Sequence, residues 1–231
     1  MKPLSIAILV VMLPLTVAHS GEIRGTVRAE GKPEASGDAA GGKYDSRKYK
    51  FVERVNYAEL RNFVVYIDGS MTNAPAATNT TARVDTKRVN QEKASFTPTI
   101  LPIVVGTTVE WPNNDDIFHN VFSMSDAKQF DLGLYKGNPK EKRVTFDKAG
   151  RVEVFCSIHA NMHCLVLVLE NPFFAVADEA GNYTIKDVPP GTYRLKAWHE
   201  RLPALTQEII VPAAGEVVMN FTLGVKNLPK Y

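Results

Sequence analysis

Short runs of β-forming residues, separated by turn residues, dominate the sequence from residue 21 onward. The 14 prolines and 15 glycines are spread along 231 residues, and few segments show the apolar spacing of an amphipathic helix. Runs rich in valine, isoleucine, threonine and aromatic residues, bounded by glycine, proline or asparagine, are typical of strands. We therefore predict an all-β fold. The predicted strands are 22–27, 63–67, 82–89, 99–105, 108–111, 120–124, 141–146, 151–155, 165–170, 183–186, 192–199, 208–211 and 217–223.

The composition is that of a folded protein without a preference for nucleic acid. Hydrophobic residues make up 45% of the chain and charged residues 23%, which is enough for a substantial core. The 27 basic and 25 acidic side chains give a net charge of +2, with no long basic block. This balance predicts no nucleic-acid partner. The length suits one large or two small domains, and the motifs favour two.

The N-terminus has the three-part layout of a secretory signal peptide. Lys2 precedes an apolar run at 4–17, and the small residues Ala18 and Ser20 are equally good cleavage positions. A membrane anchor is the alternative, but the run is shorter than the roughly 20 residues that span a bilayer. We expect residues 1–20 to be removed. The mature protein is then periplasmic or secreted, with no stable membrane insertion.

Three residues with metal-binding side chains lie close together in the segment 155–168, FCSIHANMHCLVLV. Cys156 ends a predicted strand, His159 follows three residues later and Met162 six residues later. His119 lies far upstream, in IFHNVFS, at the start of another predicted strand. A fold that places that strand beside the loop brings together a thiolate, two imidazoles and a thioether, the ligand set of blue-copper sites. The sequence therefore predicts a copper site.

This mixture of ligands suits a metal ion that changes its charge. Soft sulfur favours Cu(I), imidazole is acceptable to both oxidation states, and a thioether is a weak axial ligand. Three ligands on one short loop, with the fourth on a separate strand, resist relaxation toward the geometry that either oxidation state prefers. We expect one copper ion at such a site, passing single electrons.

The motifs FHNVF and CSIHANM resemble those of the cupredoxins, in particular plastocyanin and amicyanin. The resemblance covers roughly residues 82–170, and the CxxHxxM spacing is that of amicyanin. It implies a Greek-key β-sandwich that holds one type 1 copper ion. Carried over by position, it makes His119, Cys156 and His159 the equatorial ligands and Met162 the axial ligand.

Three neighbours of the predicted ligands affect the site. The cupredoxin resemblance implies that Asn120 hydrogen-bonds across to the ligand loop and holds it in place. His163 stands close to where relatives have a small residue, and it is either exposed beside the site or replaces Met162 as axial donor. Cys164 has three interpretations: a buried apolar residue that opens a core strand, a disulfide partner of Cys156, or a surplus ligand.

After Pro172 the segment DEAGNYTIKDVPPGTYRLKAWH resembles the carboxypeptidase regulatory-like and transthyretin-like β-sandwiches. We predict a second, smaller sandwich of this kind at 172–231. That family usually opens with a Gly-x-Val strand and an apolar strand, and GEIRGTVRA and NFVVYIDG precede the copper segment. We therefore predict that residues 21–73 supply the first half of one split sandwich. His199 shares the parity of the apolar face, and we interpret it as a packed histidine.

Together these features predict an exported blue-copper protein that carries single electrons and is not an enzyme. Copper nitrite reductases and multicopper oxidases need further histidine-rich sites, and the chain has five histidines. A resemblance to methylamine-utilisation and plastocyanin-like proteins implies a redox partner such as a c-type cytochrome or a periplasmic oxidoreductase. Two alternatives stay open: a periplasmic copper-binding and delivery protein, or a structural β-sandwich with a disulfide between Cys156 and Cys164.

Overall fold

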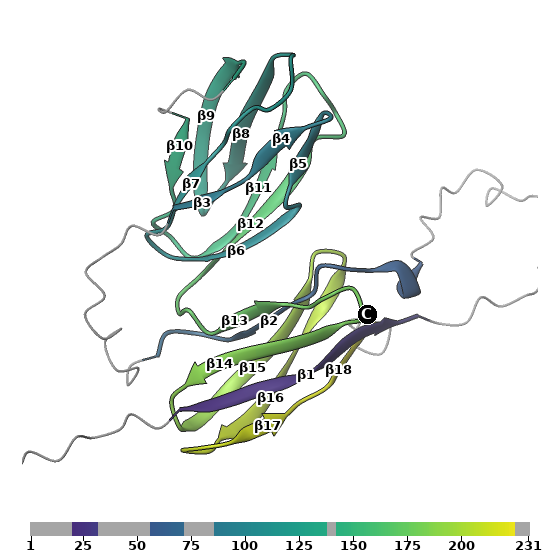
Figure 1. Cartoon of the computed structure of the whole chain (residues 1–231), viewed down its shortest axis with the longest axis vertical. Helices are drawn as coiled ribbons and strands as arrows, with labels where there is room; N and C mark the ends of the chain where they lie inside the picture. Colours follow the sequence, from purple (N-terminus) through teal and green to yellow (C-terminus); the bar gives the residue numbers. More distant parts are fainter. Residues whose placement is uncertain (1–19, 32–55, 72–85, 138–141, 225–231) are drawn as a thin grey trace, which may run out of the picture.

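The chain folds almost entirely into β-strands, which form two stacked groups (Figure 1). The structure is a computed structural model that describes residues 20–31, 56–71, 86–137 and 142–224. Within these residues the 3₁₀ turn η2 (Tyr57–Glu59) is the one helical element. The predicted all-β class is confirmed.

The upper group in Figure 1 contains a five-stranded sheet and two smaller pieces of sheet. In spatial order the five strands are β6 (Ile100–Val104), β12 (His163–Leu169), β11 (Gly150–Phe155), β8 (His119–Ser125) and β9 (Lys128–Tyr135). β6 runs parallel to β12, and the other neighbours are antiparallel. The smaller pieces are β10 (Arg143–Thr145), β7 (Thr108–Glu110) and β3 (Thr86–Arg88), and the hairpin of β4 (Asn90–Glu92) and β5 (Ser95–Thr97).

The core of the upper group lies between these sheets. Trp111, after β7, and Val144 on β10 belong to the same buried cluster as Val152 and Val154 on β11. On β11 these valines alternate with the more exposed Arg151, Glu153 and Phe155, because successive side chains of a strand point to opposite faces. Fully burying such apolar side chains stabilises the fold by about 1.5–3 kcal/mol each.

β12 is buried on both faces, which explains its unbroken apolar sequence. Its even-numbered residues face the core of the upper group, and its odd-numbered leucines belong to a cluster shared with the lower group. A strand covered on both sides reads as a continuous hydrophobic run rather than as an alternation. The two sets are Cys164, Val166 and Val168, and Leu165, Leu167 and Leu169.

The lower group is a second sandwich that joins strands from both ends of the chain (Figure 1). One sheet has β1 (Gly21–Glu30) between β14 (Asn182–Val188) and β17 (Glu216–Val218), and β18 (Phe221–Gly224) also pairs with β1. The other sheet has the order β13 (Phe174–Val176), β2 (Val64–Ile67), β15 (Gly191–His199) and β16 (Leu202–Val211). Side chains from the two sheets, such as Ile23 and Leu195, share one buried cluster.

The two groups pack against each other through β12. Val64 and Tyr66 on β2, and Trp198 on β15, join the odd-numbered leucines of β12 in one cluster. The guanidinium of Arg151 lies 5.4 Å from the ring centre of Trp198, a cation–π contact across the same boundary. The strand that follows the predicted ligand loop, β12, therefore packs directly against the second sandwich.

The predicted strands each overlap a strand of the structure, with one correction. The segment 217–223 is not continuous, since it divides into β17 and β18. The side chain of Asn220 accepts a hydrogen bond from the amide of Thr26 over 2.8 Å and so takes a place that a backbone carbonyl would fill. The sequence pattern does not predict β4, β5, β9 and β13, which are short or carry polar and glycine residues.

Some predicted segments lie outside the described residues. They include 1–19 of the predicted signal peptide and 82–85 of a predicted strand. In the part of the chain that the structure describes, no helix is long and apolar enough to cross a membrane.

Candidate metal centre

His119 and the loop after β11 meet at one end of the upper group. His119 is the first residue of β8 and has no exposed surface. Cys156, His159 and Met162 lie on the short loop that joins β11 to β12. The Met162 amide donates to the His159 carbonyl over 3.0 Å, and the Cys156 amide donates to the Met162 carbonyl over 3.3 Å. These bonds close the loop on itself, so its three side chains start from nearby positions.

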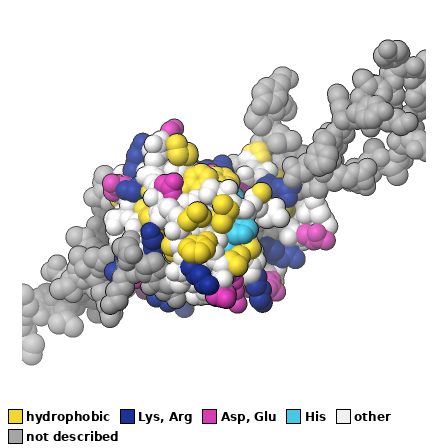
Figure 2. Space-filling model, turned by 90° about the horizontal axis from the view of Figure 1, so that it is seen from above, with side chains coloured by type: hydrophobic (Ala, Val, Ile, Leu, Met, Phe, Trp, Pro, Cys, Tyr) yellow, Lys and Arg dark blue, Asp and Glu magenta, His cyan; other side chains and the backbone are white. Residues whose placement is uncertain are grey.

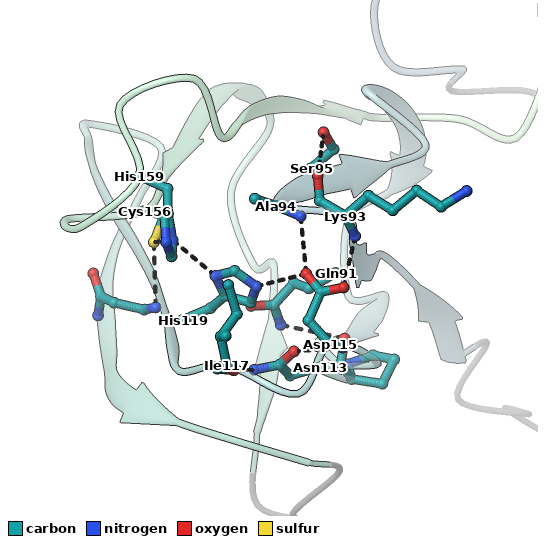
Figure 3. A network of polar contacts seen from close by, with 12 residues as sticks. Gln91, Lys93, Ala94, Ser95, Asn113, Asp115, Ile117, His119, Cys156 and His159 are labelled. Carbon is teal, nitrogen blue, oxygen red and sulfur yellow. Dashed lines mark hydrogen bonds and ion pairs between the residues drawn. The ribbon is translucent and has the colours of Figure 1, made fainter.

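The nitrogen and sulfur atoms of three of these residues converge. The Nδ1 atoms of His119 and His159 are 3.0 Å apart, and the Cys156 Sγ is 3.7 Å from the His159 Nδ1. The donor atoms of the three residues all lie within 4.8 Å of one another, and Figure 3 shows His119 with its two ring nitrogens directed to opposite sides. Metal bonds of roughly 2.0–2.3 Å place neighbouring donors at about such separations, so this set fits a metal ion.

Met162 is placed in the core next to this group. Its side chain is 1% exposed and belongs to the same buried cluster as Cys156. A thioether in an apolar, water-poor surrounding is available as a weak ligand.

Asn120 links β8 to the loop by two contacts. Its backbone amide donates to the Cys156 Sγ over 3.4 Å, and its side-chain oxygen accepts from the Ser157 amide over 3.3 Å. Its side-chain nitrogen donates to Asp131 on β9 over 2.7 Å. The side chain thereby ties the loop, β8 and β9 together.

Asp115 is a neighbour of the site that the sequence analysis missed. Its Oδ2 atom is 2.8 Å from the Nε2 atom of His119, and its two oxygens also accept from the amides of Lys93 and Ala94. The hydrogen bond from Ala94 is the main cause that lowers the pKa of Asp115, and burial partly opposes it. The available signal was the acidic pair in WPNNDDIF, four residues before the histidine, which alone does not distinguish a contact from a solvated loop.

His163 and Cys164 lie outside the converging group. His163 places its Nε2 atom 2.6 Å from the Glu153 carboxylate, and this hydrogen bond is the main cause that raises the pKa of His163. Cys164 is 1% exposed in the core, where burial raises the pKa of its thiol. Neither Cys156 nor Cys164 forms a disulfide in the structure. Of the three interpretations of Cys164, a buried apolar residue fits these positions.

The surface around the site is apolar. Ile117 and Phe118 precede His119, and Ile158 precedes His159; these three side chains are 47%, 57% and 51% exposed. Leu134, which pairs with Asn120 across β8 and β9, is also exposed. Figure 2, which views the molecule from above, shows hydrophobic side chains gathered beside a histidine on this end.

A comparison with family models assigns this part of the chain. Residues 82–169 match the model described as copper binding proteins, plastocyanin/azurin family. The matched segment is a cupredoxin domain. The converging His119, Cys156 and His159 all lie within it.

Solved structures similar to this chain include other copper proteins. A copper-containing nitrite reductase from Thermus scotoductus SA-01 is 30% identical over 37% of this chain and 22% of its own, with a TM-score of 0.34. A purple cupredoxin from Nitrosopumilus maritimus is 26% identical over 36% of this chain and 98% of its own, with a TM-score of 0.31. A variant of amicyanin with Cu(I) is 26% identical over 36% and 81%, with a TM-score of 0.30. The chain thus spans about a fifth of the nitrite reductase.

The remaining comparisons concern the second sandwich and the whole chain. Residues 170–218 match the model described as polysaccharide lyase family 4, domain II, of fibronectin type III-like class. This match shows a second β-domain beside the cupredoxin domain, and the carboxypeptidase regulatory-like resemblance stays a prediction. The sequence has no match among curated proteins.

Proposed function

We propose that this chain is an exported type 1 copper protein that carries single electrons between redox partners. His119, Cys156 and His159 are the equatorial ligands of one copper ion, and Met162 is the axial ligand. The observation that carries the proposal is the convergence of two imidazoles and one thiol, whose donor atoms lie within 4.8 Å of one another inside a cupredoxin domain.

The protein residues supply a site that does not need to rearrange. Copper bound here supplies a one-electron couple, because sulfur ligands favour Cu(I) and imidazoles accept both oxidation states. His119 is fixed at the start of a strand, while the loop is held by its own hydrogen bonds and by Asn120. The Asn120 amide donates to the Cys156 sulfur and so joins the first residue pair of β8 to the loop.

His159 is the proposed route for electrons. It is the more exposed of the two histidines. The exposed Ile158 directly precedes it, and the exposed Ile117 and Phe118 directly precede the other histidine of the site, His119. An apolar surface around a half-buried imidazole suits short-lived contact with a redox protein, since weak electron-transfer complexes bury little area. A c-type cytochrome or a periplasmic oxidoreductase is the proposed kind of partner.

The carrier role is preferred to catalysis. The nitrite reductase is matched over 22% of its length, so its activity does not transfer to this chain. Export rests on the expected removal of residues 1–20, with a periplasmic or secreted mature protein. Mass spectrometry of the mature N-terminus tests this part of the proposal separately.

We also propose that residues 21–73 and 172–231 form one discontinuous domain with the cupredoxin domain inserted between its strands. The pairing of β1 with β14 and β18, and of β2 with β13 and β15, supports this division. Insertion at a loop is a tolerated way to combine domains.

The deciding experiment is a visible absorption and electron paramagnetic resonance spectrum of the oxidised, copper-loaded mature protein. We expect an intense blue band that Cys156→Ser abolishes and Cys164→Ala retains. The second variant is the matched control, because it removes a thiol that lies outside the converging group. A wild type that binds Cu(I) but stays colourless after oxidation would contradict the carrier role and favour copper delivery.

A further inference from the structure

The hydrogen bond between Asp115 and His119 has a defined donor and a defined acceptor. A carboxylate only accepts hydrogen bonds, so the Nε2 atom of His119 must donate across the 2.8 Å separation. The neutral imidazole then has no proton on Nδ1, the nitrogen that faces His159 and Cys156. The contact therefore selects the tautomer that a metal ligand needs.

We infer that Asp115 is a positioning residue of the copper centre, which fixes the tautomer and ring orientation of His119 and strengthens it as a ligand for Cu(II). This inference rests on the proposed function, because it assigns His119 to the copper ligands. A carboxylate that accepts from the distal nitrogen of a ligand histidine raises the electron-donor strength of the ring. Stronger donation favours the more highly charged Cu(II) over Cu(I).

Asp115 is itself held by backbone groups. Its oxygens accept from the amide of Lys93 over 2.6 Å and from that of Ala94 over 2.9 Å, as Figure 3 shows. Its own amide donates over 3.0 Å to Asn113, whose side chain is buried and donates to the carbonyls of Ile117 and Tyr135. The carboxylate is thus oriented from both sides and does not depend on another flexible side chain.

The turn between β4 and β5 has an unusual backbone that fits this role. Lys93 and Ala94 have φ angles of 54° and 50°, a left-handed conformation that residues with a Cβ atom rarely adopt. Two successive residues of this kind form the tight two-residue connection of a hairpin. Here the conformation directs both amides to one carboxylate. The β4–β5 hairpin is therefore the support for Asp115.

Asp116 provides a matched control. It is adjacent in sequence and carries the same charge, but its side chain is 97% exposed and pairs with Lys136 at the surface. Removing either charge changes the net charge equally. An effect specific to Asp115→Asn therefore reports the contact with His119 rather than the loss of a nearby negative charge.

The first test uses the copper-free, full-length mature protein. ¹⁵N chemical shifts of the imidazoles should show His119 as the Nε2–H tautomer in the wild type and in Asp116→Asn. In Asp115→Ala, where no acceptor faces Nε2, we expect a mixture of tautomers. An unchanged tautomer in Asp115→Ala would overturn the inference, and this readout does not depend on whether the protein binds copper.

The second test measures Cu(II) and Cu(I) affinities and the reduction potential of the copper-loaded proteins. Loss of a partner of a ligand histidine typically lowers metal affinity by about 10–100-fold. For Asp115→Asn, which retains an oxygen acceptor but no charge, we expect a tenfold fall in the ratio of Cu(II) to Cu(I) affinity. That change raises the potential by about 59 mV. Asp116→Asn should match the wild type.

The outcomes separate the two proposals. A blue wild type whose potential is the same in Asp115→Asn and Asp115→Ala would overturn the role of Asp115 and leave the carrier function standing. If the wild type has no blue site but the His119 tautomer still changes in Asp115→Ala, the proposed function is rejected. The orientation of His119 by Asp115 then still stands. Near-ultraviolet circular dichroism identifies any variant that fails to fold. If Asp115→Ala does not fold, the test rests on Asp115→Asn, whose side chain has the same shape as that of Asp115.

Discussion

The backbone amide of Asn120 donates to the Sγ atom of Cys156 over 3.4 Å, so the strand that begins with one candidate ligand contacts another directly. The side chain of the same residue accepts from the Ser157 amide. The backbone contact survives any substitution without proline, whereas the side-chain contact does not. A substitution of Asn120 can therefore remove the side-chain contact with Ser157 while the backbone contact with Cys156 stays intact.

Asn120→Ala should leave a blue copper site that is less stable and releases copper faster. It removes the acceptor for Ser157 and the donor to Asp131, both in partly buried surroundings. Leaving such groups without a partner costs about 1–3 kcal/mol. Urea denaturation and copper transfer to a chelator measure the two effects. Asn114→Ala, at an exposed side chain in the preceding loop, is the control, and equal behaviour of the two variants would refute the role of Asn120.

Leu165→Ala should weaken the contact between the two domains. Leu165 is fully buried in the cluster shared by β12, β2 and β15. Truncating a buried leucine costs about 2–5 kcal/mol. Denaturant unfolding followed by fluorescence should show the loss, together with poorer overlap of the transitions of the two domains. Ile210→Ala, at a side chain that is 71% exposed, should stay within about 0.5 kcal/mol of the wild type.

The buried His199 should make the protein less stable at mildly acidic pH. Burial against Phe63 is the main cause that lowers its pKa, while Glu200 raises it and Arg201 lowers it further. Below the unfolded-state value of about 6.5, the unfolded chain binds a proton that the folded chain does not. The contribution of His199 to the free energy of unfolding is therefore fully present above that pH and is lost as the pH decreases toward the folded-state pKa of His199.

The measurement is the free energy of unfolding at several pH values between 7.5 and 5.5, for the wild type and for His199→Gln. The variant should be less stable at pH 7.5 but should lose less stability on acidification. Other groups titrate equally in both proteins, so the difference in slope isolates His199. Parallel pH profiles would show that His199 takes up its proton equally in both states.

A fragment of residues 172–231 should not fold alone. β1 is the strand with which β14, β17 and β18 pair, and β2 lies between β13 and β15. Without β1 and β2, each of the two sheets that enclose the core loses a central strand. Circular dichroism and NMR should show neither cooperative unfolding nor dispersed resonances. A folded fragment would disprove the proposed discontinuous domain.

The strongest sequence signals were those in which residue type and spacing both carry meaning. The spacing of Cys156, His159 and Met162 places three donors on one loop, and the structure brings Cys156 and His159 together with His119. Strands with regular alternation or continuous apolar runs were also predictable. In these cases the local pattern reflects a burial pattern that the fold preserves.

The parts that could not be predicted depend on contacts between distant segments. The β4–β5 hairpin has two non-glycine residues at positions that usually favour glycine or asparagine, so Lys93 and Ala94 give no turn signal. Asp115 becomes meaningful only when that hairpin and His119 lie on either side of it. Similarly, the break between β17 and β18 depends on a hydrogen bond from Thr26, nearly 200 positions earlier in the chain.

The double burial of β12 has a consequence for how this sequence evolves. Neighbouring positions of one strand are selected by different domains: substitutions at Val166 must suit the cupredoxin core, while those at Leu165 and Leu167 must suit Val64 and Trp198. Odd and even positions of the strand should then covary with separate sets of residues among homologous chains. A cupredoxin domain that lost its attached sandwich would be free to replace the odd-numbered leucines by polar residues, while the even-numbered positions stayed apolar.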